Sequence, residues 1–241
     1  MKNIDILAVS PHPDDVELAC SGTLIHLIDK GYRAAIVDMT DALLSTTGDP
    51  VTRQTEAEAA RKIMDVHEHY QLGLKEGSLT ASGENLYRMV SLIRRTRPYL
   101  VLAPYKEDRH PDHSATSQIV QSACFWAGVP KYGDNQAPHR PHRLVNYFLH
   151  WEGPVSFVVD ISATFDRKLK AIRAYHSQFL AQPGDRSYTY ISRPEFLENI
   201  INRARYHGSQ IGAEYGEPFY TRETQRVDDM MDWANTQGVV G

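Results

Sequence analysis

The chain has 241 residues, 41% of them hydrophobic, and a formal net charge of −4. This length suffices for one domain over residues 1–241, while the acidic balance excludes the basic field that nucleic-acid binding needs, so we expect no nucleic-acid partner. Two cysteines are too few for a disulfide framework and no apolar run reaches 18 residues, so we expect a cytoplasmic protein with no membrane partner.

The first half of the chain alternates predicted strands with predicted helices. Residues 4–9 are short, mostly apolar and followed by Pro11, which predicts a buried parallel strand. Asp49 followed by proline is typical of a helix start, because an N-cap acceptor precedes a residue suited to the first turn. The other expected elements are helix 20–30, strand 34–39, a helix continuing from Asp49 to residue 64, a weak strand at 70–74, a loop at 77–83 and an amphipathic helix around residues 86–93 that ends before Pro98.

The second half continues this alternation. We expect a strand at 99–103, a helix at 114–126, a long connection at 129–143, strands at 144–149 and 157–161, a helix around 165–175, an irregular segment from Pro183 and a late helix at 196–206. Alternating strands and helices predict an α/β, Rossmann-like three-layer αβα fold with a mostly parallel central sheet. The glycine-rich fingerprint of dinucleotide binding is missing after the first strand, so a dinucleotide site has little support.

Two short polar loops follow two of the predicted strands. Residues 10–15, Ser-Pro-His-Pro-Asp-Asp, come after strand 4–9, and residues 109–113, Arg-His-Pro-Asp-His, follow strand 99–103 after a short link. In a parallel sheet, ligands bind outside the carboxyl ends of the strands. We therefore expect the two loops to meet and to form one site.

The loops carry the side chains of a hydrolytic metal site. A catalytic divalent ion typically takes three protein ligands and leaves one position for water, and His12, Asp15 and His113 supply such a set. Neighbouring residues of an extended loop point in different directions, so Asp14 is left as the general base for the water that the ion would activate. The set describes hydrolysis of an amide.

Two further residues of the second loop are predicted to assist. His110 is close in sequence to the proposed ligand His113, so we expect its side chain near the metal. There it could stabilise an oxyanion or protonate a leaving amine. Asp112 could orient His110, although a plain loop role is equally compatible with its position.

Residues 11–17 and 110–113 closely resemble the motifs of the LmbE-like, PIG-L family of zinc-dependent N-acetylglucosamine deacetylases. Residues 103–113, 141–143 and 174–179 resemble the bacillithiol branch, which removes acetyl from N-acetylglucosaminyl malate. The resemblance implies the LmbE-like fold, a Zn²⁺ cofactor, a small N-acetylated amino sugar as substrate and a homo-oligomer, either trimer or hexamer. It also implies that Arg53 binds substrate, and we predict Arg109 as a second substrate contact. Ferrous iron accepts the same ligands.

The chain departs from the family pattern at two places. Lys75-Glu76-Gly77 stands where relatives often have Pro-Asp-Gly, and Phe196 stands near the position of a tyrosine that polarises the substrate carbonyl. Tyr188 or Tyr190 could replace that tyrosine. Two other functions use the same ligands: a non-haem iron enzyme, which ordinarily has a jelly-roll fold and H-x-[DE] spacing, and an inactive sugar-binding module, which would need neither Asp14 nor His110.

Overall fold

The computed structural model describes residues 4–41, 43–44, 47–133, 135–179, 190–224 and 226–236. Within them, seven strands form one sheet in the order β3-β2-β1-β4-β5-β7-β6. The strands are β1 (Ile6–Ser10), β2 (Ala34–Thr40), β3 (Glu68–Leu74), β4 (Leu100–Pro104), β5 (Arg143–Tyr147), β6 (Phe157–Asp160) and β7 (Gly216–Tyr220). The helices are α1 (Asp15–Asp29), α2 (Pro50–Met64), α3 (Gly83–Thr96), α4 (Pro111–Trp126), α5 (Phe165–Arg173), α6 (His176–Phe179), α7 (Pro194–Gln210) and α8 (Met230–Thr236).

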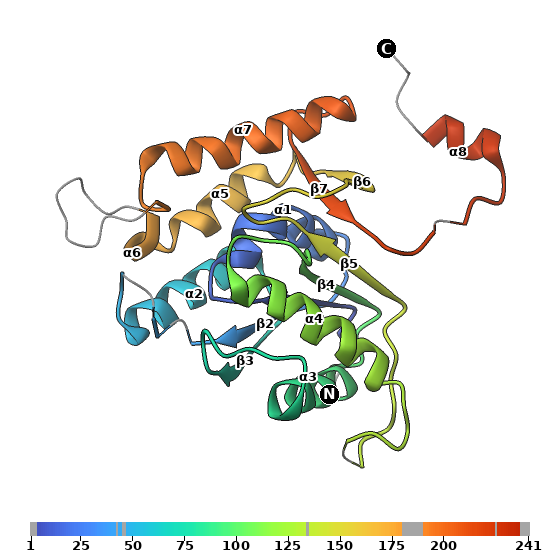
Figure 1. Ribbon diagram of the computed structural model, residues 1–241. Coiled ribbons are helices and arrows are strands. Elements are labelled where there is room, and N and C mark those ends of the chain that lie inside the picture. The colour runs from blue at the N-terminus through green and yellow to red at the C-terminus, as the bar shows by residue number, and fades with distance from the viewer. Residues whose placement is uncertain are drawn as a thin grey trace.

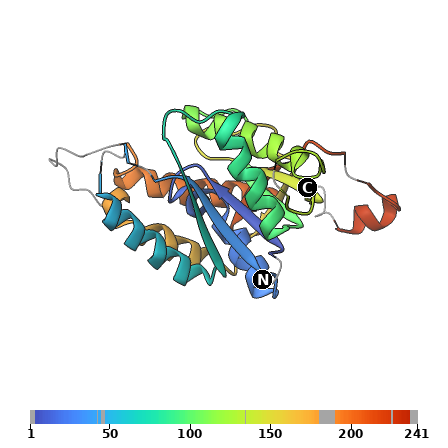
Figure 2. The same ribbon diagram turned by 90° about the horizontal axis from the view of Figure 1, so that it is seen from below.

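The sheet lies between two layers of helices (Figures 1 and 2). Helices α1, α2, α5 and α7 bury their apolar residues in the cluster on one face, and α3 and α4 bury theirs in the cluster on the other. Strands β1 to β5 pair in parallel, while β7 runs antiparallel to its neighbours β5 and β6. The predicted α/β fold with a mostly parallel central sheet is confirmed.

The strand order places a topological switch beside β1. The chain runs from β1 outward to β2 and β3, then returns to the other side of β1 as β4, so Ile6 pairs with Ala34 on one side and with Leu100 on the other. Leu7, Ala8 and Val9 are fully buried because helices cover both faces of this strand. Crevices at such switch points are the usual ligand sites of open α/β sheets, and the loops after β1 and β4 flank this one.

Helix α1 begins earlier than its sequence pattern indicates. The pattern predicts a start near Cys20, but the helix starts at Asp15 and has a non-helical residue at Cys20 (φ −138°, ψ 15°). The amides of Gly22 and Thr23 beyond this kink donate to the buried carboxylate of Glu217 in β7 (2.9 and 2.7 Å). The predicted start therefore matches the second half of the helix, whose first amides are capped by a residue about 195 positions away.

Other differences concern element ends and the C-terminal part. Strand β5 stops at Tyr147 rather than at residue 149, because the guanidinium of Arg203 takes the carbonyls of Phe148 and Leu149 (3.0 and 2.6 Å). Strand β7 and helix α8 are not predicted by the sequence pattern, and β7 contains a glycine and a proline that weaken a strand pattern. The segment predicted to be irregular from Pro183 begins outside the described residues. No helix of the described part is long and apolar enough to cross a membrane.

Candidate metal centre

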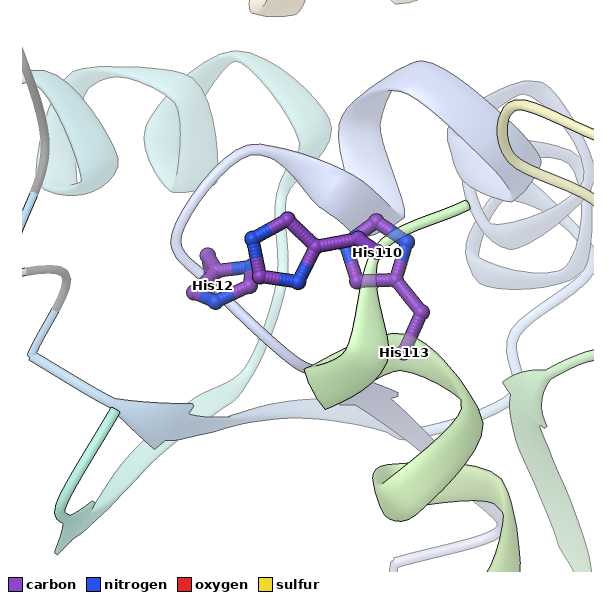
Figure 3. A group of neighbouring side chains, drawn as sticks. All are labelled: His12, His110 and His113. Atoms are coloured by element: carbon purple, nitrogen blue, oxygen red, sulfur yellow. The ribbon is translucent and has the colours of Figure 1, made fainter. Parts of the chain in front are cut away.

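The two polar loops meet at the carboxyl ends of β1 and β4. His12 lies in the loop after β1, and His110 and His113 lie at the start of α4, so that the three imidazoles are neighbours (Figure 3). The ring centroid of His12 is 4.7 Å from that of His110 and 5.4 Å from that of His113. One nitrogen from each ring lies within 4.8 Å of the others, a spacing that could hold a metal ion.

Asp15 joins the histidines of the two loops. Its Oδ2 atom lies 3.2 Å from Nδ1 of His12 and 3.3 Å from Nε2 of His113. The same oxygen accepts the backbone N–H of His12 at 2.9 Å, which fixes the carboxylate inside the loop. All three side chains are buried. Two imidazole nitrogens and one carboxylate oxygen that converge in this way suit Zn²⁺ and other divalent ions.

The surrounding carboxylates favour positive charge at this point. Burial alone lowers the pKa of His12, but hydrogen bonds to Asp112 and Asp15 raise it to about 10. Burial also lowers the pKa of His113, while the charge of Asp15 and a hydrogen bond to Asp108 raise it to about 9. A bound divalent cation would satisfy the same carboxylates in place of these protons. The donor set therefore fits a metal ion in both geometry and charge.

Asp14 has an unusual backbone conformation and a cationic neighbour. Its φ of 120° lies in a region that costs a non-glycine residue of order 1–3 kcal/mol. Two nitrogens of Arg53 lie 3.3 Å from its Oδ2 atom, and Arg53 also donates to the carbonyl of Pro13 at 2.5 Å. Burial raises the pKa of Asp14 to about 7, against the lowering effect of Arg53. The structure thus brings Arg53, from the first turn of α2, directly to the first loop.

His110 is held by backbone groups of its own loop. Its backbone N–H donates to Asp108 at 2.9 Å, and its Nδ1 atom accepts the N–H of Asp112 at 3.2 Å. Because Nδ1 is an acceptor, we assign the proton of the neutral ring to Nε2. Burial and the neighbouring His12 and His113 lower the pKa of His110.

The carboxylate of Asp112 does not make the contact expected of a residue that orients the His110 ring. Its Oδ2 atom accepts the backbone N–H of Gly77 at 2.9 Å and lies 3.4 Å from Nε2 of His12. Among the described residues its carboxylate makes no hydrogen bond to the His110 ring, and only its amide does. The side chain instead links His12 to the loop after β3, where Glu76 lies 3.6 Å from the same nitrogen of His12.

Asp108 is a principal organiser of the site that the sequence pattern does not single out. Its Oδ1 atom lies 3.0 Å from Nδ1 of His113 and 3.1 Å from Nδ1 of His150. It also accepts the backbone N–H groups of His110, His150 and Trp151. Although burial opposes it, hydrogen bonds from His113 and His150 hold the pKa of Asp108 far below its usual range. This contact places the proton of His113 on Nδ1 and leaves Nε2 to face Asp15.

We expect Asp108→Asn to weaken metal binding by about 10- to 100-fold, the usual effect of removing the charge of a group that orients a ligating histidine. The dissociation constant can be measured by competition with a chelator. Asp166→Asn, an exposed aspartate in the first turn of α5, is the matched control. An unchanged dissociation constant in a cooperatively folded Asp108→Asn protein would contradict the role.

Two cavities meet beside the cluster. One, of about 290 Å³, contains the metal cluster together with Arg53 and Glu76, and we call it the metal cavity. The other, of about 260 Å³, has apolar and aromatic walls from Phe148, Trp151 and Phe196, and we call it the side cavity. Both are lined by Leu18, Arg109, His150 and Tyr190.

The sequence does not decide which of Tyr188, Tyr190 and Phe196 completes the substrate pocket. Tyr190 lines both of them and its ring lies 5.1 Å from the guanidinium carbon of Arg109. Phe196 lines the side cavity and packs against Phe179 and Tyr190, but it is not part of the metal cavity. Tyr188 lies outside the described residues.

Comparison with known proteins supports the same chemistry. Residues 7–124 match the family described as GlcNAc-PI de-N-acetylase, PIG-L. The chain is 33% identical over 132 residues to the uncharacterized deacetylase YaiS of Escherichia coli, covering 51% of this chain and 69% of that protein. It is 29% identical over 224 residues to the diacetylchitobiose deacetylase of Thermococcus kodakarensis, covering 88% of this chain and 80% of that protein.

A more distant relative and a solved structure extend the comparison. The probable N-acetyl-α-D-glucosaminyl L-malate deacetylase 2 of Bacillus anthracis is 25% identical over 190 residues, covering 72% of this chain and 81% of that protein. The crystal structure of the conserved protein TT1542 from Thermus thermophilus superposes with a TM-score of 0.86 at 34% identity, covering 93% of this chain and 98% of that one.

Proposed function

The chain belongs to the PIG-L family and is a deacetylase, a hydrolase that acts on amides, and on this premise we propose that it removes acetyl from an N-acetylglucosamine joined to a second group. The observation that carries the proposal is the position of Asp15 between His12 and His113 inside a cavity that also contains Asp14 and His110. Water adds to the acetyl carbon, the carbon–nitrogen bond breaks, and acetate and a free amine leave.

We assign the metal to His12, Asp15 and His113, with Zn²⁺ as the ion and Fe²⁺ as the alternative. When bound, such an ion polarises the amide carbonyl and acidifies water. The position of His110 in the same cavity also allows it to be a further ligand. In our assignment, however, the Nε2–H group of the His110 ring donates to the oxygen on which negative charge develops.

Asp14 is assigned as the general base. It takes a proton from the attacking water, and that proton can then pass to the departing nitrogen. Arg53 neutralises part of the charge of this buried carboxylate and lines the cavity in which the sugar would lie. An inactive sugar-binding module would need neither Asp14 nor His110 in this cavity.

The two connected cavities support a substrate with two parts. We place the N-acetylated sugar in the metal cavity and the second group in the side cavity, whose aromatic walls suit the face of a sugar ring or another apolar surface. Arg109 lies where the cavities join, and its exposed guanidinium forms no ion pair with a carboxylate of the described chain. Two conjugates fit this arrangement: diacetylchitobiose, named for the relative with the longer match, and N-acetylglucosaminyl malate, which the sequence motifs favour.

Release of acetate from three compounds tests the proposal: free N-acetylglucosamine, diacetylchitobiose and N-acetylglucosaminyl malate. We expect a higher kcat/KM for at least one conjugate than for the free sugar, because the second group adds contacts in the side cavity. Arg109→Gln should lower kcat/KM about 10-fold or more for the malate conjugate, from loss of a charged contact, and should change the chitobiose value little. Lys131→Gln, an exposed cation outside both cavities, is the control. Failure to release acetate from all three compounds would contradict the proposed function.

A further inference from the structure

A third and larger cavity lies on the side of α4 that faces β5 and β7. Its volume is about 470 Å³, and it has no described lining residue in common with the metal cavity. Four separate segments form its walls: the end of β4, helix α4, the start of β5 with the residues before it, and the end of β7. The lining residues are Tyr105, Lys106, Ser117, Gln121, Cys124, Phe125, Arg140, Pro141, His142, Arg143, Leu144, Asn146, Tyr220, Arg222 and Glu223. We call it the basic cavity.

The charge of its walls opposes that of the whole chain. Among the described lining residues there are four permanent cations, one lysine and three arginines, and one carboxylate, that of Glu223. The formal net charge of the chain is −4, so this concentration of positive charge is not a general property of the surface. Like charges brought together in a concave site repel one another unless an anion lies between them.

Little in the described chain neutralises these cations. Arg143 donates to the carbonyl of its own neighbour His142, and Arg140 donates to the carbonyl of Phe125 and lies over the ring of that residue. Neither of them, nor Arg222, forms an ion pair with a carboxylate in the described part of the chain. Lys106 pairs with Glu107 at 3.2 Å, and both of these side chains are exposed. The three exposed guanidiniums therefore keep N–H donors that no described carboxylate accepts.

The remaining walls suit a compact organic molecule. The rings of Tyr105 and Tyr220 meet edge to face with centroids 5.1 Å apart, and Phe125 adds a third ring. Guanidinium groups bind the oxygens of phosphate and carboxylate in pairs, and arginine is the preferred residue where such planar recognition matters. Aromatic faces beside them offer a surface for a ring attached to the anionic group.

From this charge and shape we propose that the basic cavity binds a small phosphorylated molecule at a place separate from the catalytic centre. The bound ligand would touch elements that carry the metal site. Ser117 lies one helical turn after His113 on α4, and Lys106 lies two residues before Asp108. The inference does not depend on the deacetylase assignment, since none of the proposed catalytic residues lines this cavity.

Isothermal titration of the full-length protein tests the proposal with three probes: adenosine monophosphate, inorganic phosphate and succinate. We expect adenosine monophosphate to bind, phosphate to compete with it, and succinate to bind at least tenfold more weakly. The double variant Arg143→Glu/Arg222→Glu should weaken binding at least tenfold. Lys131→Glu/Lys170→Glu makes the same change of charge sign at exposed lysines outside the cavity and should bind as the wild type does.

Two further measurements locate the bound probe and report on association of the chain. His113→Ala should bind adenosine monophosphate like the wild type, and loss of binding in that variant would place the probe in the metal cavity and overturn the proposal. Sedimentation of the wild type and the double charge variant gives the number of copies in the assembly. If no probe binds and the double variant changes that number, the cavity is an interface with a second copy and the proposal is wrong.

Discussion

Replacement of Asp14 by asparagine is expected to lower kcat for deacetylation by about 10²- to 10⁴-fold, the contribution typical of a general base. An amide side chain cannot take a proton from water. Asparagine is the appropriate replacement because the residue has φ 120°, and asparagine and aspartate tolerate positive φ better than other residues with a side chain. Alanine would combine loss of the base with added backbone strain.

The bound metal should remain in Asp14→Asn, because the proposed ligands are His12, Asp15 and His113. Steady-state kinetics and elemental analysis on the same preparation separate loss of turnover from loss of metal. Asp166→Asn makes the same chemical change at an exposed position and should show wild-type rates. A wild-type rate in metal-loaded Asp14→Asn would remove Asp14 from the mechanism.

The sequence alone is sufficient to predict that the two loops lie close together. His12 and His113 lie about a hundred positions apart, yet each follows a buried strand, and parallel neighbours present their carboxyl ends at one edge of the sheet. The structure adds that β4 is the direct neighbour of β1, which places the loops on either side of the switch point. The alternation of strands and helices predicts such an edge, because the position of the edge depends on hydrophobic periodicity and on the order of the elements. It does not depend on exact side-chain contacts.

The supporting residues cannot be found in this way. Asp108 looks like one more charge after Glu107, and its role comes from the turn that directs it toward His113 and His150, which lie 5 and 42 positions away. A single weak signal is present, namely a carboxylate two residues before His110 in the loop that follows β4. No motif links His150 to Asp108 in the sequence, and only the return of the chain after β5 brings the two side chains together.

The same limit applies to long-range contacts elsewhere. Glu217 caps the second half of α1 and pairs with Lys168 at 2.6 Å deep in the protein. Neither role leaves a pattern in β7, whose glycine and proline hide even the strand. The basic cavity likewise collects residues from four segments, whereas the sequence indicates only a long connection over 129–143. Local periodicity predicts the helices and strands, but these sites form only where those elements pack against one another.

The second large effect is expected at His113. Its replacement by alanine should remove the metal and with it all measurable deacetylation, because His113 supplies one of three assigned ligands and is buried at the junction of both loops. Elemental analysis after dialysis against metal-free buffer measures the stoichiometry. His176→Ala, an exposed histidine at the start of α6, should retain metal and activity.

His110→Ala distinguishes the assigned ligand set from one made of three histidines. The nitrogens of His12, His110 and His113 are close enough to share one ion, so proximity does not select Asp15 over His110. Our assignment predicts that His110→Ala keeps stoichiometric metal and loses turnover. In the wild type, the ring N–H of His110 would donate to the oxygen that gains negative charge and would not bind the ion. Loss of metal from both histidine variants would instead make His110 a ligand, and stoichiometric metal in His113→Ala would refute the assigned set. Asp15→Asn completes the comparison, because an amide oxygen is a weaker ligand and should release the metal only if Asp15 binds it.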